Sequence, residues 1–161
     1  MTETQTMNHA GAAKISLFGL EALDERRALI SSLVQSGRDL LPSDVRQLRR
    51  ALFEDEGASR EEAQALFELE RTQAAPCAEW TAFFIECLTD HVVWQCRPTG
   101  IVVDEQAEWL VREADRCRLA TGAALLANVL AEAHRAPGWL IAAVRARVAA
   151  PEVQAELARE D

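Results

Sequence analysis

The chain has little of what interrupts helices or marks a secreted or membrane protein. Its 161 residues include only seven glycines and five prolines, no tyrosine, and one lysine, Lys14. No stretch approaches the roughly 20 apolar residues of a membrane span, and residues 1–14 lack the basic start and apolar run of a secretory signal. No Cys-x-x-Cys spacing occurs, so we expect reduced, mostly buried thiols rather than zinc or redox motifs at the four cysteines, Cys77, Cys87, Cys96 and Cys117.

Basic residues are also in deficit, because 17 Lys and Arg face 26 Asp and Glu and the net charge is -9. Nucleic acids and anionic membrane surfaces select basic proteins. We therefore expect no nucleic-acid partner and no direct membrane insertion, and the thiols favour the cytoplasm. The apolar content of 49% is enough for one globular core.

Alanine and leucine dominate the chain, and its prolines fall between stretches of helical periodicity. The pattern predicts an all-α fold, a compact bundle of about seven helices. We expect a flexible leader over residues 1–14, a single helical domain over 15–150, and a short acidic C-terminal helix or tail over 151–161. A long central helix is predicted from Cys77 to Cys96, and N-caps are predicted at Ser59, Asp104 and Thr121.

One short pattern occurs twice, over residues 53–66 and 99–110. Each copy has a glycine turn followed by Glu-x-Ala-x-x-Leu, with Glu61 matching Glu105 in the second copy. This internal pseudo-repeat predicts two related helical hairpins that pack against one another.

The central helix carries the best candidate for metal binding. Glu86 and Asp90 are four residues apart, so they share one helix face with Glu79. Such a pair binds a hard cation if neighbouring segments add oxygen ligands, for which Asp55, Glu61, Glu105 and Asp115 are available. The alternative is a solvated helix face, or a carboxylate paired with Arg97 or Arg112.

Complete catalytic motifs are missing from the sequence. It has no phosphate-binding loop, no Gly-x-Ser-x-Gly elbow and no Glu-x-x-His pair. Cysteine–histidine catalysis would require Cys87 or Cys96 to lie exposed beside His91, and Cys87 falls on an apolar face, which indicates a buried thiol. We therefore expect that the protein is not an enzyme.

Most of the aromatic residues recur at core spacing, but Trp94 falls outside the apolar stripe of the central helix. An exposed indole is a frequent anchor in protein interfaces. Trp94 is therefore the predicted partner-binding residue.

The runs from Leu48 to Leu66 and from Glu79 to Asp90 resemble the acidic turn and central helix of TerB-like proteins, the tellurite-resistance helical family, and of uncharacterised bacterial relatives. The similarity covers roughly Arg38 to Arg135. It implies an all-α fold and a stress-associated cytoplasmic protein that is not an enzyme. It also implies divalent-metal binding through Asp55, Glu61, Glu86, Asp90 and Glu105.

Two functions follow as hypotheses. The first is a non-enzymatic helical module that acts by protein–protein interaction in a stress response. The second is a divalent-metal-binding module that uses the acidic residues of the central helix and adjacent turns. The sequence specifies neither the partner, the ion nor the oligomeric state.

Overall fold

The computed structural model describes residues 25–53 and 57–159, and the described chain is helical throughout, with no strand. This confirms the all-α prediction. Residues 25–36 are helical and lead into a series of named helices. These are α2 (Pro42–Phe53), α3 (Arg60–Thr72), α4 (Ala78–Thr89), the π-helix η1 (Asp90–Gln95), α5 (Asp104–Ala114), α6 (Leu119–Glu132), α7 (Gly138–Ala149) and α8 (Pro151–Arg159).

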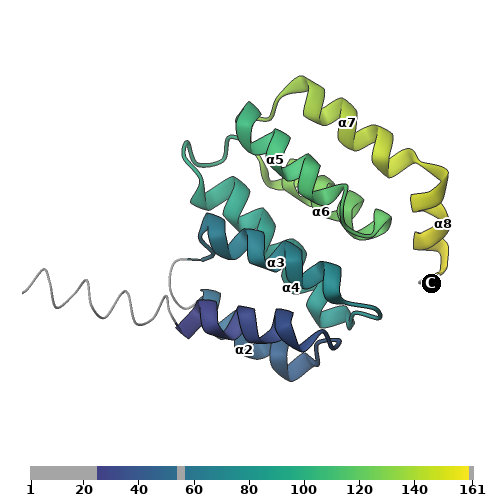
Figure 1. The fold of residues 1–161 in the computed structure, drawn as a ribbon. Coiled ribbons are helices and arrows are strands. Elements are labelled where there is room, and N and C mark those ends of the chain that lie inside the picture. The colour runs from purple at the N-terminus through teal and green to yellow at the C-terminus, as the bar shows by residue number, and fades with distance from the viewer. Residues whose placement is uncertain (1–24, 54–56, 160–161) are drawn as a thin grey trace, which may run out of the picture.

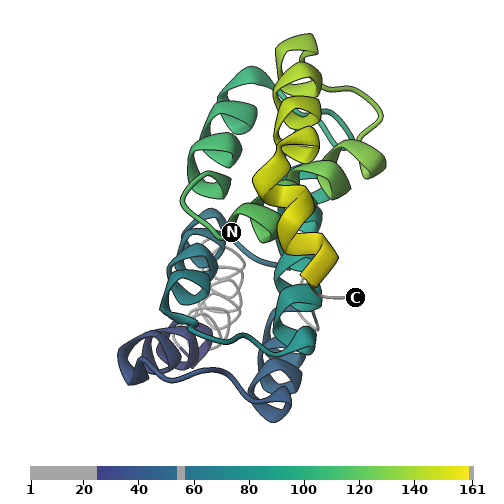
Figure 2. The ribbon, with the colours of Figure 1, turned by 90° about the vertical axis from the view of Figure 1, so that its right-hand side faces the viewer.

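The helices stack in chain order, from α2 at one end through α3 and α4, then α5 and α6, to α7 at the other end (Figure 1). Helix α4 contacts α2, α3 and α6, and α6 contacts α5, α7 and α8. In the perpendicular view, α7 and α8 cross the front of the molecule (Figure 2). Within the part of the chain that is described, no helix is long and apolar enough to cross a membrane.

The two copies of the sequence pattern occupy equivalent positions. Gly57 and Gly100 both have positive φ, at 86° and 80°, and precede α3 and α5 respectively. The matching alanines and leucines are fully buried in both copies, namely Ala63 with Ala107 and Leu66 with Leu110. The repeated pattern therefore corresponds to two helix N-termini with the same arrangement, in which Ala63 or Ala107 allows close packing.

Side chains from the starts of α3 and α5 interlock the two copies. The guanidinium carbon of Arg60 lies 3.8 Å from the centre of the Trp109 ring, and the Trp109 indole donates to Gln64 Oε1 at 3.0 Å. Phe67 meets Trp109 edge to face at 5.5 Å between centroids. Trp109 is thus the side chain through which the second copy packs against the first.

Local sequence signals were correct where they concerned apolar periodicity and mixed where they concerned caps. The predicted capping box of Ser59 and Glu62 is present. Asp104 is the first residue of α5, after an N-cap at Val103, and Thr121 is a buried residue inside α6, which begins at Leu119. The predicted caps at Asp104 and Thr121 are therefore wrong. The N-cap of α5 lies one residue earlier than predicted, and the N-cap of α6, Arg118, lies three residues earlier.

Glu62 does more than cap α3, because its carboxylate is buried against Arg26. Arg26 Nη2 donates to Glu62 Oε1 at 3.0 Å and to the carbonyl of Gly57 at 2.8 Å, and Nε lies 2.9 Å from Oε2. The side chains of Arg26 and Glu62 are 9% and 1% exposed. This ion pair joins helix 25–36 to the first turn of the repeat.

A second carboxylate of α3, Glu70, is buried in a different environment. Its Oε2 accepts a hydrogen bond from Trp80 Nε1 at 2.6 Å, whereas its Oε1 has no hydrogen-bond partner in the described structure. Burial raises the pKa of Glu70, and the Trp80 hydrogen bond and the charge of Arg118 oppose this only in part. Folding therefore favours the neutral acid at this position.

The two glutamates make a matched test of buried charge. We expect Glu70→Gln to raise the melting temperature at pH 7, because the amide can still accept from Trp80 and carries no charge to bury. The gain should shrink below about pH 4.5, where Glu70 is protonated in the folded and unfolded states alike. Thermal denaturation of the variant and the parent at pH 4 and pH 7 measures both effects.

Glu62→Gln is the control, since glutamine preserves the capping box but removes the counter-charge of Arg26. Loss of that charge-assisted interaction should cost about 2 kcal/mol and lower the melting temperature by roughly 6 °C. If both variants shift stability in the same direction at pH 7, the distinction between a paired and an unpaired buried carboxylate is wrong.

Candidate functional site

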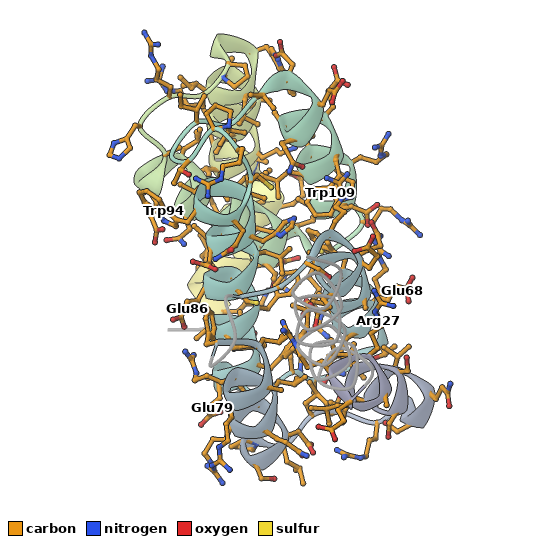
Figure 3. All side chains as sticks on the ribbon, turned by 90° about the vertical axis from the view of Figure 1, so that its left-hand side faces the viewer. Arg27, Glu68, Glu79, Glu86, Trp94 and Trp109 are labelled. Atoms are coloured by element: carbon orange, nitrogen blue, oxygen red, sulfur yellow. The ribbon has the colours of Figure 1, made fainter. Side chains whose placement is uncertain are left out.

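The predicted metal ligands of the central helix have different partners in the structure. Glu79, Glu86 and Trp94 follow one outer side of α4 and η1 (Figure 3), so two of the three carboxylates predicted to share a helix face lie on this side. Glu86 is exposed and forms an ion pair with Arg49 Nη2 at 2.8 Å. Its partner thus comes from α2 and is neither of the arginines considered from the sequence.

Asp90 lies beside Gly57, the glycine of positive φ that precedes α3. A Cβ atom on Gly57 would lie 2.8 Å from Asp90 Oδ2, and Gln95 Nε2 donates to the same oxygen at 3.1 Å. Asp55, the predicted ligand that precedes Gly57 in the sequence, lies outside the described residues. Of this predicted pair of ligands, the structure therefore describes Asp90 alone, beside Gly57.

Glu61 and Glu105 are exposed at equivalent positions in the first turns of α3 and α5. In the described ranges, no three side chains from His, Cys, Asp and Glu gather closely enough to hold a metal ion. The predicted ligand set is thus not assembled by described residues alone, and metal binding remains a prediction.

Trp94 is 38% exposed, whereas Trp80 is fully buried and Trp109 nearly so. Its indole N–H donates to Glu132 Oε2 at 2.9 Å, and its ring meets that of His134 edge to face at 5.7 Å. The predicted partner-binding residue is therefore accessible and held in a fixed orientation.

A second tryptophan, Trp139, is also fixed by a hydrogen bond from its indole N–H to a carboxylate. Two loop segments, the first around Gly100 and the second around Arg135, are joined by backbone hydrogen bonds. His134 N donates to Gly100 O at 2.8 Å, and Val102 N donates to Arg135 O at 2.9 Å. Trp94, before the first segment, bonds to Glu132. Trp139, after the second segment, bonds to Asp104 Oδ1 at 2.8 Å and is 43% exposed.

We call this arrangement the tryptophan clasp, defined by Trp94, Glu132, Trp139 and Asp104, because each indole crosses to the other segment. Val103, which is 37% exposed, precedes Asp104 in the clasped loop. Sequence reasoning identified Trp94 and missed Trp139. The Pro137-Gly138 turn immediately before Trp139 was the available signal, since an aromatic residue beside a turn is often at a surface.

Inside the bundle, the structure pairs His91 with Cys96. His91 is buried, and its Nδ1 lies 2.9 Å from the carbonyl oxygen of Ala58. Since a carbonyl only accepts, Nδ1 carries the proton and Nε2 presents its lone pair. Nε2 lies 3.9 Å from the Sγ atom of the half-buried Cys96.

The π-helix explains why this pair was not predicted. An α-helix turns about 100° per residue, so positions five apart point in different directions. In η1 the backbone bond from Cys96 N to His91 O, at 3.1 Å, closes the wider turn of a π-helix. His91 and Cys96 consequently lie on one side, as do Asp90 and Gln95. A local widening of this kind leaves no recognisable mark in the sequence.

Polar groups from α3 and α5 surround the Cys96 thiol. Gln106 Oε1 accepts from Arg60 at 2.6 Å, which turns the amide Nε2 of Gln106 toward Cys96 Sγ. Burial raises the pKa of Cys96, and outweighs the Gln106 hydrogen bond and the charge of Arg60, which favour the thiolate. Burial also lowers the pKa of His91, so a neutral thiol faces a neutral imidazole near pH 7.

Comparison with protein-family models, with curated proteins and with solved structures finds no match to this chain. The resemblance to TerB-like proteins therefore stays a prediction, and the candidate sites depend on their geometry alone.

Gly100 provides a test of the clasp. Its φ of 80° favours glycine, and a Cβ atom there would lie 2.6 Å from His134 Cδ2. We expect Gly100→Ala to destabilise the protein by about 1–3 kcal/mol and to shift the fluorescence of Trp94 and Trp139. Chemical denaturation and emission spectra measure the two effects.

Gly138→Ala is the matched control, because a Cβ atom at Gly138 meets nothing within 4 Å and the residue begins α7. It should be neutral or slightly stabilising. Equal destabilisation by both substitutions would contradict the role assigned to Gly100.

Proposed function

We propose that this protein is a non-enzymatic helical module of the cytoplasm that binds a protein partner through the tryptophan clasp. The observation that carries the proposal is the pair of accessible indoles, each fixed by a carboxylate from the other clasped segment. The stress association implied by the resemblance belongs to the same proposal, as does the absence of a nucleic-acid partner.

The energetics of the clasp support docking. Tryptophan supplies a large apolar contact area, and interfaces derive much of their free energy from a few such residues. Hydrogen bonding of both N–H groups within the protein leaves the ring faces for contact, and fixed orientation reduces the entropy lost on binding. Other exposed apolar side chains, such as Leu41, lack such support.

The charge of the chain favours a partner of basic character. The net charge is -9, and the two carboxylates of the clasp, Glu132 and Asp104, lie beside the accessible rings. A partner segment with apolar side chains flanked by Arg or Lys would fill the ring faces and meet these carboxylates.

Photocross-linking in living cells tests the surface. A photoreactive amino acid at Val103 should give one discrete adduct, which should be lost when Trp94 and Trp139 are both replaced by Ala. The control is the same probe at Leu157 of α8, which has similar exposure, at 41% against 37%. Helix α8 lies at the right of the view, opposite the start of α5 (Figure 1).

Circular dichroism of the double variant establishes that its fold is retained. Adduct formation at both positions, or persistence of the Val103 adduct without the tryptophans, would contradict the proposal. An adduct of twice the 17.8 kDa chain mass would instead show that the surface binds a second copy of this protein.

Divalent-metal binding is the second candidate function, and the position of Asp90 beside Gly57 is the observation that favours it. At a 100-fold excess over its Kd, a divalent ion should stabilise the protein by about 2.7 kcal/mol. Asp90→Asn should abolish the resulting rise in melting temperature, whereas Glu79→Gln, on the outer side of α4, should preserve it. Elemental analysis of protein purified without chelator gives a separate reading, and an unchanged thermal shift in Asp90→Asn would exclude Asp90 as a ligand.

A further inference from the structure

We propose that Cys96 is a site of oxidative modification by hydroperoxides, with His91 as the base that accepts the thiol proton. This inference is independent of the proposed docking function, since it depends on the contact between His91 of η1 and Cys96, the residue that follows η1. Cys96 is one of four free cysteines, and the structure distinguishes it from the other three by its surroundings.

The geometry supplies a base in the correct tautomer. The carbonyl of Ala58 fixes the proton of His91 on Nδ1, so the lone pair of Nε2 faces Cys96 Sγ at 3.9 Å. The edge of His91 also packs against Trp109 at 5.9 Å between ring centroids, which holds the imidazole in place. A fixed, neutral imidazole beside a thiol is the arrangement that general-base activation requires.

The groups on the other side of the sulfur stabilise the negative charge that develops there. The Gln106 amide N–H points at Sγ, and Arg60 holds that amide through Oε1. The Arg60 charge is itself fixed over the Trp109 ring at 3.8 Å. His91 of η1 and Gln106 of α5 therefore contact the sulfur directly, and Arg60 of α3 acts through the Gln106 amide that it holds.

The chemical step balances with hydroperoxide as the oxidant. The sulfur attacks the terminal peroxide oxygen, so that an S–O bond forms as the O–O bond breaks. The thiol proton moves to His91 Nε2 and from there to the departing oxygen, which leaves as water or an alcohol. Sulfur is oxidised to a sulfenic acid and the peroxide is reduced.

The other thiols lack this environment in the described structure. Burial raises the pKa of Cys96 and also raises the pKa of Cys87 and of Cys117, the latter two to about 12, so what distinguishes Cys96 is the His91 imidazole beside its sulfur. Cys77 precedes α4 and is half-buried like Cys96, but no imidazole contact is found for it among the described residues. Cys77 is therefore an internal reference for accessibility without a base.

Native alkylation with iodoacetamide at pH 7.5, followed by peptide mapping, tests the base. We expect Cys96 to react at least about tenfold faster than Cys77, and His91→Gln to remove most of that advantage. Burial without base assistance predicts the opposite order. Equal rates at the two cysteines, or an unchanged rate at Cys96 in His91→Gln, would overturn the proposal.

Because His91 is buried, Gln106→Leu provides a second variant that leaves the imidazole in place. It should slow Cys96 while Cys77 keeps its rate, which also reports that the fold is retained. Treatment with hydrogen peroxide and a sulfenic-acid trap should then label Cys96 alone. Labelling of Cys77 to the same extent would show that oxidation follows exposure and not the His91 base.

Discussion

The π-helical turn at the end of the central helix is the constraint on which the candidate sites depend. In η1 the backbone bond from Cys96 N to His91 O closes a widened turn, which sets the directions of His91, Trp94 and Cys96. It buries His91 against Ala58 and leaves Trp94 at the surface. An unbroken α-helix over the same residues would separate Cys96 from His91 and move Trp94 away from Glu132.

The repeated helix starts supply the frame around that turn. Helices α3 and α5 begin after glycines of positive φ and bury equivalent alanines and leucines, which brings Arg60 and Gln106 to the same place. Trp109 packs between the two copies, and its ring makes a cation–π contact with the Arg60 guanidinium. The interior thiol and the core therefore share one set of contacts, so changes at Trp109 affect both.

Buried charge is used in two contrasting ways within α3. Glu62 is compensated by Arg26 and anchors helix 25–36, whereas Glu70 has one hydrogen bond and a raised pKa. The first arrangement stabilises a particular packing of helices, because either charge alone would be costly to bury. The second costs stability at neutral pH, because the Trp80 hydrogen bond and the charge of Arg118 offset the burial only in part.

The sequence alone determined the all-α fold, the Ser59 capping box and the buried face of the central helix, because periodicity and capping act within a few residues. It also separated Trp94 from the core. Tertiary structure decided that Glu86 pairs with Arg49, that Trp139 joins Trp94 in the clasp, and that Cys96 meets His91. These outcomes depend on contacts between distant segments and on one widened helical turn, neither of which has a local sequence signal.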